Sequence, residues 1–335
     1  MSKLIFKNRI KDLTIRHYKN CLVYQKIIDK LGFNKKEKDI NNFPFIPVNL
    51  FKTLELTSVS KNKIVKVLNS SGTTGTIKSK IYLDRNNSNN QRIVLKEIVQ
   101  NIIGTERLPM LIIDQNPSLK QNKNMAAKEA GIYGFSMFGK NHQYLLDQNN
   151  CINYDNLQSF LNNFSNNKFL MFGFTSNIYK YLIKNFDFNK IQKNDFRNGV
   201  LIHGGGWKKM LSKKINNKEF RILLEEKLNL KDIYNYYGLV EQTGSIFFEC
   251  PKCNLFYTSK YSDIIIRDNK LNVLTKGKGM IQLLSILPTS YPGHNILTED
   301  EGEIINNNCE CKKWGKQFKI HGRIKRSEIR GCSDV

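Results

Sequence analysis

The spacing of hydrophobic residues along the chain predicts helices and strands in alternation. Apolar residues recur at helical spacing over 11–32 and 86–104, and Gly32 marks a stop for the first of these helices. Further helices are expected at about 155–165 and 175–186. Short apolar runs rich in β-branched residues predict strands at 63–68, 80–84, 108–114, 168–174 and 199–203. Strands that alternate with helices favour an α/β fold with crossover connections.

The pattern changes after residue 245, where helical spacing fades. The remaining apolar runs are short and predict strands at 245–249, 263–267, 280–286 and 303–305. We therefore expect a helical N-terminal segment (1–60) packed on an α/β core (61–247), followed by a β-rich C-terminal part (248–335).

The loop between the first two predicted strands has an unusual composition. It reads Ser70-Ser71-Gly72-Thr73-Thr74-Gly75-Thr76-Ile77-Lys78, with five hydroxyl residues, two glycines and a lysine. Glycines allow the backbone to approach a ligand closely, and successive N–H groups beside hydroxyls and a lysine can cradle an anion. The loop does not match the Walker pattern, because its glycines are too close together and no helix pattern follows. A polyphosphate cradle and an ordinary polar hairpin loop both fit this composition.

The stretch Ser71-Gly72-Thr73-Thr74-Gly75-x-x-Lys78 resembles the phosphate loop of the adenylate-forming enzymes, the acyl- and aryl-CoA synthetase superfamily, although Ile77 stands where that superfamily usually has proline. One branch is similar over more of the chain, namely the acyl-protein synthetases of bacterial luminescence pathways. The segments that carry this second resemblance are 45–52, 107–114, 290–294 and 322–334. Together they span roughly residues 40–335.

The resemblance implies an α/β fold that corresponds to the large domain of the adenylate-forming enzymes. The sequence stops 13 residues after Gly322, so we expect it to lack the mobile small C-terminal domain and that domain's catalytic lysine. The implied activity is ATP- and Mg²⁺-dependent conversion of a carboxylic acid, most simply a fatty acid, into acyl-AMP and then a thioester. The implied partner is an acyl-accepting protein such as an acyl reductase or an acyl carrier protein.

By the same resemblance, particular residues of the 61–247 core and beyond inherit roles. Tyr237 would stack on adenine, Gly238 would permit the turn, and Glu241 would hold Mg²⁺. Val240 replaces the usual threonine, and Thr243 is a candidate substitute. Gly204, Gly205 and Gly206 match an adenine-binding turn, Asp300 matches the residue that binds the ribose hydroxyls, and Arg323 belongs to the hinge motif. Without the resemblance, the same residues fit a strand–helix loop, a core tyrosine and solvated carboxylates.

Cys332 is the expected acyl acceptor. It lies three residues from the C-terminus beside Arg330, and nearby guanidinium groups favour the nucleophilic thiolate. The luminescence-type enzymes carry their acyl group on a cysteine near the C-terminus, and the context Arg330-Gly331-Cys332-Ser333-Asp334 resembles theirs. Without the resemblance, a stray thiol in a frayed tail would be the preferred interpretation of Cys332. Lys78, or Lys325 and Arg326, would supply positive charge at the α-phosphate in place of the missing lysine.

Four other cysteines form two close pairs, Cys250-x-x-Cys253 and Cys309-x-Cys311. Four thiolates suit a closed tetrahedral zinc site, so we expect a structural Zn²⁺ clip in the C-terminal part. Reduced surface thiols are the alternative.

The chain carries 53 lysine and arginine residues against 29 aspartate and glutamate residues, a net charge of +24. The basic residues are scattered and match no nucleic-acid-binding motif, so we interpret the charge as a general surface property that attracts ATP and anionic partners. With neither a secretory signal nor a run long enough to span a membrane, the expected location is the cytoplasm. Two alternatives stay open: a ligase that transfers the acyl group to coenzyme A or a carrier protein, and a zinc-containing basic protein that binds nucleic acid.

Overall fold

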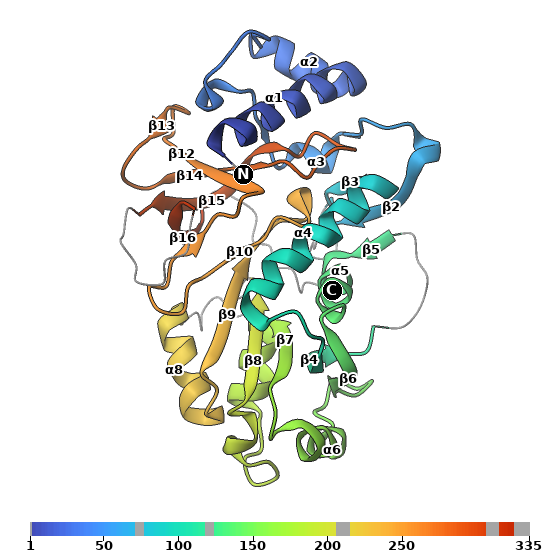
Figure 1. Ribbon diagram of the computed structural model, residues 1–335, viewed down its shortest axis with the longest axis vertical. Helices are drawn as coiled ribbons and strands as arrows, with labels where there is room; N and C mark the ends of the chain where they lie inside the picture. The colour runs from blue at the N-terminus through green and yellow to red at the C-terminus, as the bar shows by residue number, and fades with distance from the viewer. Residues whose placement is uncertain (1, 71–76, 118–123, 206–214, 306–314, 325–335) are drawn as a thin grey trace.

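The computed structural model describes residues 2–70, 77–117, 124–205, 215–305 and 315–324 (Figure 1). One half of it is built on a six-stranded sheet in the order β10-β9-β8-β7-β4-β6. The strands β4, β6, β7, β8 and β9 run parallel, and β10 is an antiparallel edge strand. Their bounds are Leu108–Gln115, Gly139–Leu146, Phe169–Phe174, Gly199–Gly204, Asp232–Tyr237 and, for β10, Phe247–Phe248. Every residue of β7 and β8 is buried, because helices cover both faces of a parallel sheet.

Neighbouring residues of these strands face different helices. Leu111 and Leu201 pack in the cluster formed with α6, α7 and α8, whereas Ile112 and Val200 pack in the cluster formed with α4 and α5. The helices are α4 (Arg85–Ile103), α5 (Ala127–Ser136), α6 (Tyr154–Phe164), α7 (Thr175–Ile178), which continues as the π-helix Tyr179–Lys184, and α8 (Asn217–Leu228). This doubly covered sheet is the α/β core that the alternating pattern predicts.

The second half is an antiparallel sheet in the order β11-β16-β15-β14-β12-β13, with β1 paired in parallel to β15. These strands are β1 (Ile46–Pro47), β11 (Phe256–Tyr257), β12 (Ser262–Arg267), β13 (Val273–Leu274), β14 (Gly279–Ser285), β15 (Asn295–Ile304) and β16 (Gln317–Arg323). A small third sheet, β3-β2-β5, joins β2 (Ile64–Asn69), β3 (Lys80–Asp84) and β5 (Asn124–Ala126). The remaining short helical segments are Ile40–Asn42, α3 (Leu50–Thr53), Lys61–Lys63, Lys193–Phe196 and Val240–Gln242.

The single N-terminal helix expected over 11–32 is wrong in extent. Two helices are present, α1 (Lys3–Asn20) and α2 (Leu22–Lys30), and the Ser2 side chain caps the first of them. Cys21 separates them in an extended conformation, with φ −129° and ψ 97°. The chain then returns to α1, where the rings of Tyr18 and Phe33 lie 5.7 Å apart. The two helices form one end of the long axis of the molecule, and α6 lies toward the other (Figure 1).

Most other predicted elements are confirmed, with shifted ends. The strand expected at 245–249 is only the two-residue β10, while the one expected at 303–305 is the end of the ten-residue β15. The strands β6 and β9 were not predicted, because their polar residues break the apolar runs. In the described part of the chain, no helix is both long and apolar enough to cross a membrane.

A buried polar network attaches α1 to the rest of the protein. Thr14 Oγ1 hydrogen-bonds with His294 Nε2 at 2.9 Å. The His17 ring bonds to Ser58 Oγ at 2.8 Å and to the Pro288 carbonyl at 3.0 Å. Both histidines are fully buried. Burial lowers the pKa of His17 to about 3 and lowers that of His294 well below its ordinary value. The neutral rings therefore hold the helix in place.

We expect this network to make the fold sensitive to acid. Below pH 6.5 the unfolded chain protonates its histidines, whereas folded His17 stays neutral until about pH 3, so the free energy of unfolding falls as pH falls through this window. His17→Gln removes one such group and should lower the slope by about 1.4 kcal/mol per pH unit. Urea unfolding at several pH values measures it, with His142→Gln on β6 as the matched control. An unchanged slope in His17→Gln would contradict the assignment.

Candidate active site

The hydroxyl- and glycine-rich loop connects β2 and β3, which pair antiparallel with Asn69 opposite Lys80. Ser70 and Ser79 tie its two ends together. Ser70 N donates to the Ser79 carbonyl at 3.0 Å, and Ser79 N donates to Ser70 Oγ at 2.8 Å. Lys78 is partly exposed beside this closure. The predicted phosphate-binding residues Ser71, Gly72, Thr73, Thr74 and Gly75 lie outside the described residues. The expected strand–loop–strand arrangement is thus present at both ends of the loop.

Glu241 is a buried carboxylate close to this closure. It lies in the 3₁₀ segment Val240–Gln242 after β9 and is 4% exposed. Burial raises the pKa of its carboxyl, and the Ser79 hydroxyl and Arg323 partly offset that effect. Within the described residues, Glu241 forms no salt bridge. A buried carboxylate beside a hydroxyl is a suitable ligand set for a hard cation such as Mg²⁺, so these residues fit the predicted metal.

Tyr237, Asp300 and Arg323 meet where the two large sheets come together. Tyr237 ends β9 of the parallel sheet, and its hydroxyl donates to Asp300 Oδ2 on β15 at 2.6 Å. Arg323 of β16 pairs with Asp300 across the ladder; its Nε lies 3.8 Å from Asp300 Oδ1, and its Nη1 lies 3.3 Å from Glu299 Oε2. Burial raises the pKa of Asp300, against the opposing effects of Tyr237 and Arg323. The Asp300 carboxylate is therefore a largely buried hydrogen-bond acceptor with the positive charge of Arg323 beside it.

The glycine turn after β8 is occupied in part by the protein itself. A Cβ on Gly204 would lie 2.5 Å from Tyr236 Cε1, so the Tyr236 ring rests on the bare backbone. Gly205 has φ +81°, a left-handed conformation that glycine adopts readily. The resemblance predicted that the adenine ring would lie on this backbone. Nothing in the sequence indicated that the Tyr236 ring contacts it. Gly206 lies outside the described residues.

The segment 287–294 packs against residues of the candidate site. The Asn87 side chain, fully buried in the first turn of α4, accepts from Thr289 N and Ser290 N and donates to the Leu287 carbonyl. Gln242 Nε2 donates to the carbonyls of Leu283 and Gly293. A Cβ on Gly293 would come within 2.4 Å of the Glu241 carbonyl, so this segment is pressed against the residue that carries the carboxylate.

Two predicted details have a different structural context. Thr243 Oγ1 donates to the Val240 carbonyl at 2.6 Å, which commits its proton to the backbone rather than to a phosphate. Gly238 stands against Ile246, where a Cβ would be 3.1 Å from Ile246 Cγ2. The predicted roles of Thr243 as a hydroxyl near the phosphates and of Gly238 as the turn residue stay predictions.

The cysteines are only partly visible. Cys250 is buried and Cys253 partly exposed, in a tight turn in which Asn254 N donates to the Cys250 carbonyl. Cys309, Cys311 and Cys332 lie outside the described residues. Over the ranges that the structure describes, no group of three or more His, Cys, Asp or Glu residues could hold a metal ion. The zinc clip stays a prediction.

The site is thus assembled from three sheets. Ser79 comes from the β2–β3 hairpin, Tyr237 and Glu241 from β9 and the segment after it, and Asp300 and Arg323 from the antiparallel sheet. Sequence reasoning missed Ser79, although it directly follows Lys78. It also missed Asn87, which is separated from its partners by about two hundred residues and has no local signal.

The chain is similar to known proteins over most of its length. The family model described as "Acyl-protein synthetase, LuxE" matches residues 1–335. A long-chain-fatty-acid–luciferin-component ligase of Vibrio harveyi is 23% identical over 326 residues, which are 95% of this chain and 83% of the relative.

Solved structures match over most of the chain. An open conformation of 2-hydroxyisobutyryl-CoA ligase, in complex with 2-HIB-AMP and CoA, superposes with a TM-score of 0.71 at 13% identity, covering 96% of this chain and 74% of that one. ATP-bound MatB of Rhodopseudomonas palustris gives 0.53 at 13% identity, covering 79% and 49%. At such identities these likenesses show a shared fold.

We expect Tyr237→Phe to destabilise the junction of the sheets. The buried Asp300 carboxylate would lose its donor, at a cost of about 1–3 kcal/mol in the free energy of unfolding. Urea unfolding at neutral pH measures the change, and Tyr133→Phe on α5 is the matched loss of a hydroxyl. Equal stabilities for both variants would mean that the Tyr237–Asp300 hydrogen bond contributes nothing to the junction.

Proposed function

Because the chain belongs to the acyl-protein synthetase family, and is therefore an acid–thiol ligase of the adenylate-forming kind, we propose that it uses ATP to load a long-chain fatty acid onto its own Cys332. In the first step a carboxylate oxygen of the acid attacks the α-phosphorus of ATP, and pyrophosphate leaves as acyl-AMP forms. In the second step the Cys332 thiolate attacks the acyl carbon, the thioester forms and AMP leaves.

The observation that carries this proposal is the convergence of Tyr237, Asp300, Arg323 and Glu241 beside the Ser70–Ser79 closure. In our assignment Asp300 accepts hydrogen bonds from the ribose hydroxyls, Tyr237 packs on adenine near the Gly204–Gly205 turn, and the loop that ends at Lys78 binds the phosphates. Glu241 would hold Mg²⁺, which when bound neutralises phosphate charge.

The protein's contribution to the first step is positioning and charge neutralisation. An in-line displacement needs the carboxylate, phosphorus and leaving oxygen aligned, and fixed donors in a site of low water content serve that purpose well. Lys78 is our assignment for the cation at the α-phosphate, since it is partly exposed where the loop ends.

The acyl group would then pass from Cys332 to an acyl-accepting protein, such as an acyl reductase or an acyl carrier protein. A reducing cytoplasm, the location we propose, would keep the acceptor as a thiol.

A reducing cytoplasm also suits the proposed zinc clip of Cys250, Cys253, Cys309 and Cys311, which the tight turn at Cys250 supports. Metal analysis of the purified chain tests the clip: one zinc per chain is expected, and a zinc-free folded protein would refute it.

ATP–pyrophosphate exchange across a panel of carboxylic acids tests the first step. We expect exchange that depends on a long-chain acid and on magnesium. Lys78→Ala should reduce its rate about a hundredfold, because a charge that stabilises the transition state is lost. Lys80→Ala, an exposed lysine two residues further along, is the control. Normal exchange in Lys78→Ala would rule out that assignment, and absence of exchange with every acid would rule out the proposed chemistry.

Labelled fatty acid tests the second step. Cys332→Ser should lose protein-bound label almost completely while keeping ATP–pyrophosphate exchange, because only the thiol acceptor is removed. Cys151→Ser removes an exposed thiol before α6 and should leave labelling unchanged. If Cys332→Ser still carries the label, another residue is the acceptor.

A further inference from the structure

The outer surface of α1 and α2 exposes an unusual number of apolar side chains. Among the described residues, eleven large hydrophobic residues are strongly exposed, and four of them lie between residues 4 and 31. They are Leu4, Ile5, Leu22 and Leu31, each between 51% and 64% exposed. Globular proteins scatter such residues singly, so the occurrence of two in α1, one at the start of α2 and one directly after α2 indicates contact with something apolar.

The same segment is more basic than the rest of the chain. Residues 2–40 hold eleven lysine or arginine residues and four acidic ones, a net charge of +7 within a total of +24 over 335 residues. The exposed residues of α1 include Leu4 and Ile5 together with Arg9, Asp12 and Lys19, while Ile10 and Leu13 face inward. On α2, Leu22, Lys26 and Lys30 are exposed at four-residue spacing, which places them on one face.

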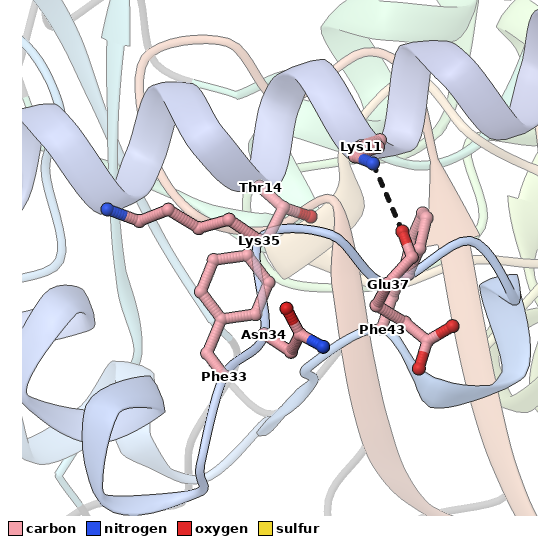
Figure 2. A pocket seen from close by; sticks show the side chains of 7 residues that line it. All are labelled: Lys11, Thr14, Phe33, Asn34, Lys35, Glu37 and Phe43. Atoms are coloured by element: carbon pink, nitrogen blue, oxygen red, sulfur yellow. Dashed lines mark hydrogen bonds between the residues drawn. The ribbon is translucent and has the colours of Figure 1, made fainter.

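The hollow on the inner side of α1 is too small to bind a ligand. The hollow between α1 and the chain at 33–43 leaves no room for a water molecule, and Figure 2 shows Lys11 of α1 donating to the Glu37 carbonyl across it. Helix α1 is also firmly held, because Arg16 Nε donates to the Thr289 carbonyl and His17 binds the Pro288 carbonyl. Whatever binds the outer face would therefore bind the whole protein in one orientation.

We propose that the α1–α2 surface docks the protein on an anionic lipid bilayer. Basic side chains on a helix face are attracted to the negative surface of such a membrane, and leucine and isoleucine among them insert at the boundary between headgroups and acyl chains. The positive charge of this surface favours an anionic partner. The exposed aliphatic side chains favour a partner with a fluid apolar layer, as a lipid bilayer has. Docking of this kind places the enzyme where long-chain acids dissolve, although it does not rest on the catalytic assignments above.

Co-sedimentation of the full-length protein with vesicles tests the proposal. We expect binding to phosphatidylcholine vesicles that contain phosphatidylglycerol, weak binding to phosphatidylcholine alone, and a loss of binding as salt is raised. The double variant Leu4→Ser with Ile5→Ser should lower the partition coefficient about tenfold. Lys26→Glu with Lys30→Glu should lower it further at low salt. Ile222→Ser with Val273→Ser, which removes exposed apolar residues elsewhere, is the matched control and should bind normally.

Three results would overturn the proposal: no binding of the unsubstituted protein to anionic vesicles, no effect of the Leu4 and Ile5 substitutions, or an equal effect of the control. Binding to immobilised polyglutamate that is as strong as vesicle binding and insensitive to Leu4 and Ile5 would assign the surface to an acidic protein instead. ATP–pyrophosphate exchange with the long-chain acid supplied in detergent solution, without vesicles, should be unchanged in all variants, which separates a failure of docking from a failure of the catalytic proposal.

Discussion

The buried amide of Asn87 is the interaction on which the arrangement of the two halves depends. It lies at the start of α4, a helix of the parallel-sheet half, and it binds the backbone of 287–290 in the antiparallel half. Ser290 continues the connection, since its hydroxyl donates to the Tyr82 carbonyl and its own carbonyl accepts from Ser58 N. Asn87 and Ser290 together connect the loop-bearing hairpin, the N-terminal segment and the segment 287–290 to one another. Loss of the Asn87 amide would leave several buried backbone groups of 287–290 without hydrogen-bond partners at once.

The candidate site buries negatively charged groups, whereas the protein as a whole carries a large positive charge. In a chain with a net charge of +24, the site buries two carboxylates, Glu241 and Asp300, and raises the pKa of both. Among the described residues, the partly buried Arg323 lowers the pKa of both carboxyls. The protein thus concentrates acceptor groups where a polyhydroxyl or metal-bound ligand would need them, and it leaves attraction of anions to its exterior.

Local patterns predicted the parts of this fold that local physics determines. The buried strands β7 and β8 and the amphipathic α4 stand out because their apolar residues follow one period. Tyr237, Glu241, Asp300 and Arg323 were proposed only from motifs that resemble those of the adenylate-forming enzymes; the structure brings Tyr237, Asp300 and Arg323 together, and the roles of all four stay predictions. The break at Cys21, the Tyr236 ring on Gly204 and the Asn87 network were not found. Each depends on residues far apart in the sequence, and no single segment carries a sign of the contact.

The contact of Tyr236 with Gly204 links the variability of two distant positions. The aromatic ring occupies the volume in which a β-carbon would stand, at a calculated 2.5 Å from Cε1. A homologue with alanine or a larger residue in place of Gly204 therefore needs a smaller partner in place of Tyr236, and a homologue that keeps the tyrosine must keep the glycine. The two sites should covary as a pair, a signature that aligned sequences can reveal without any measurement of activity.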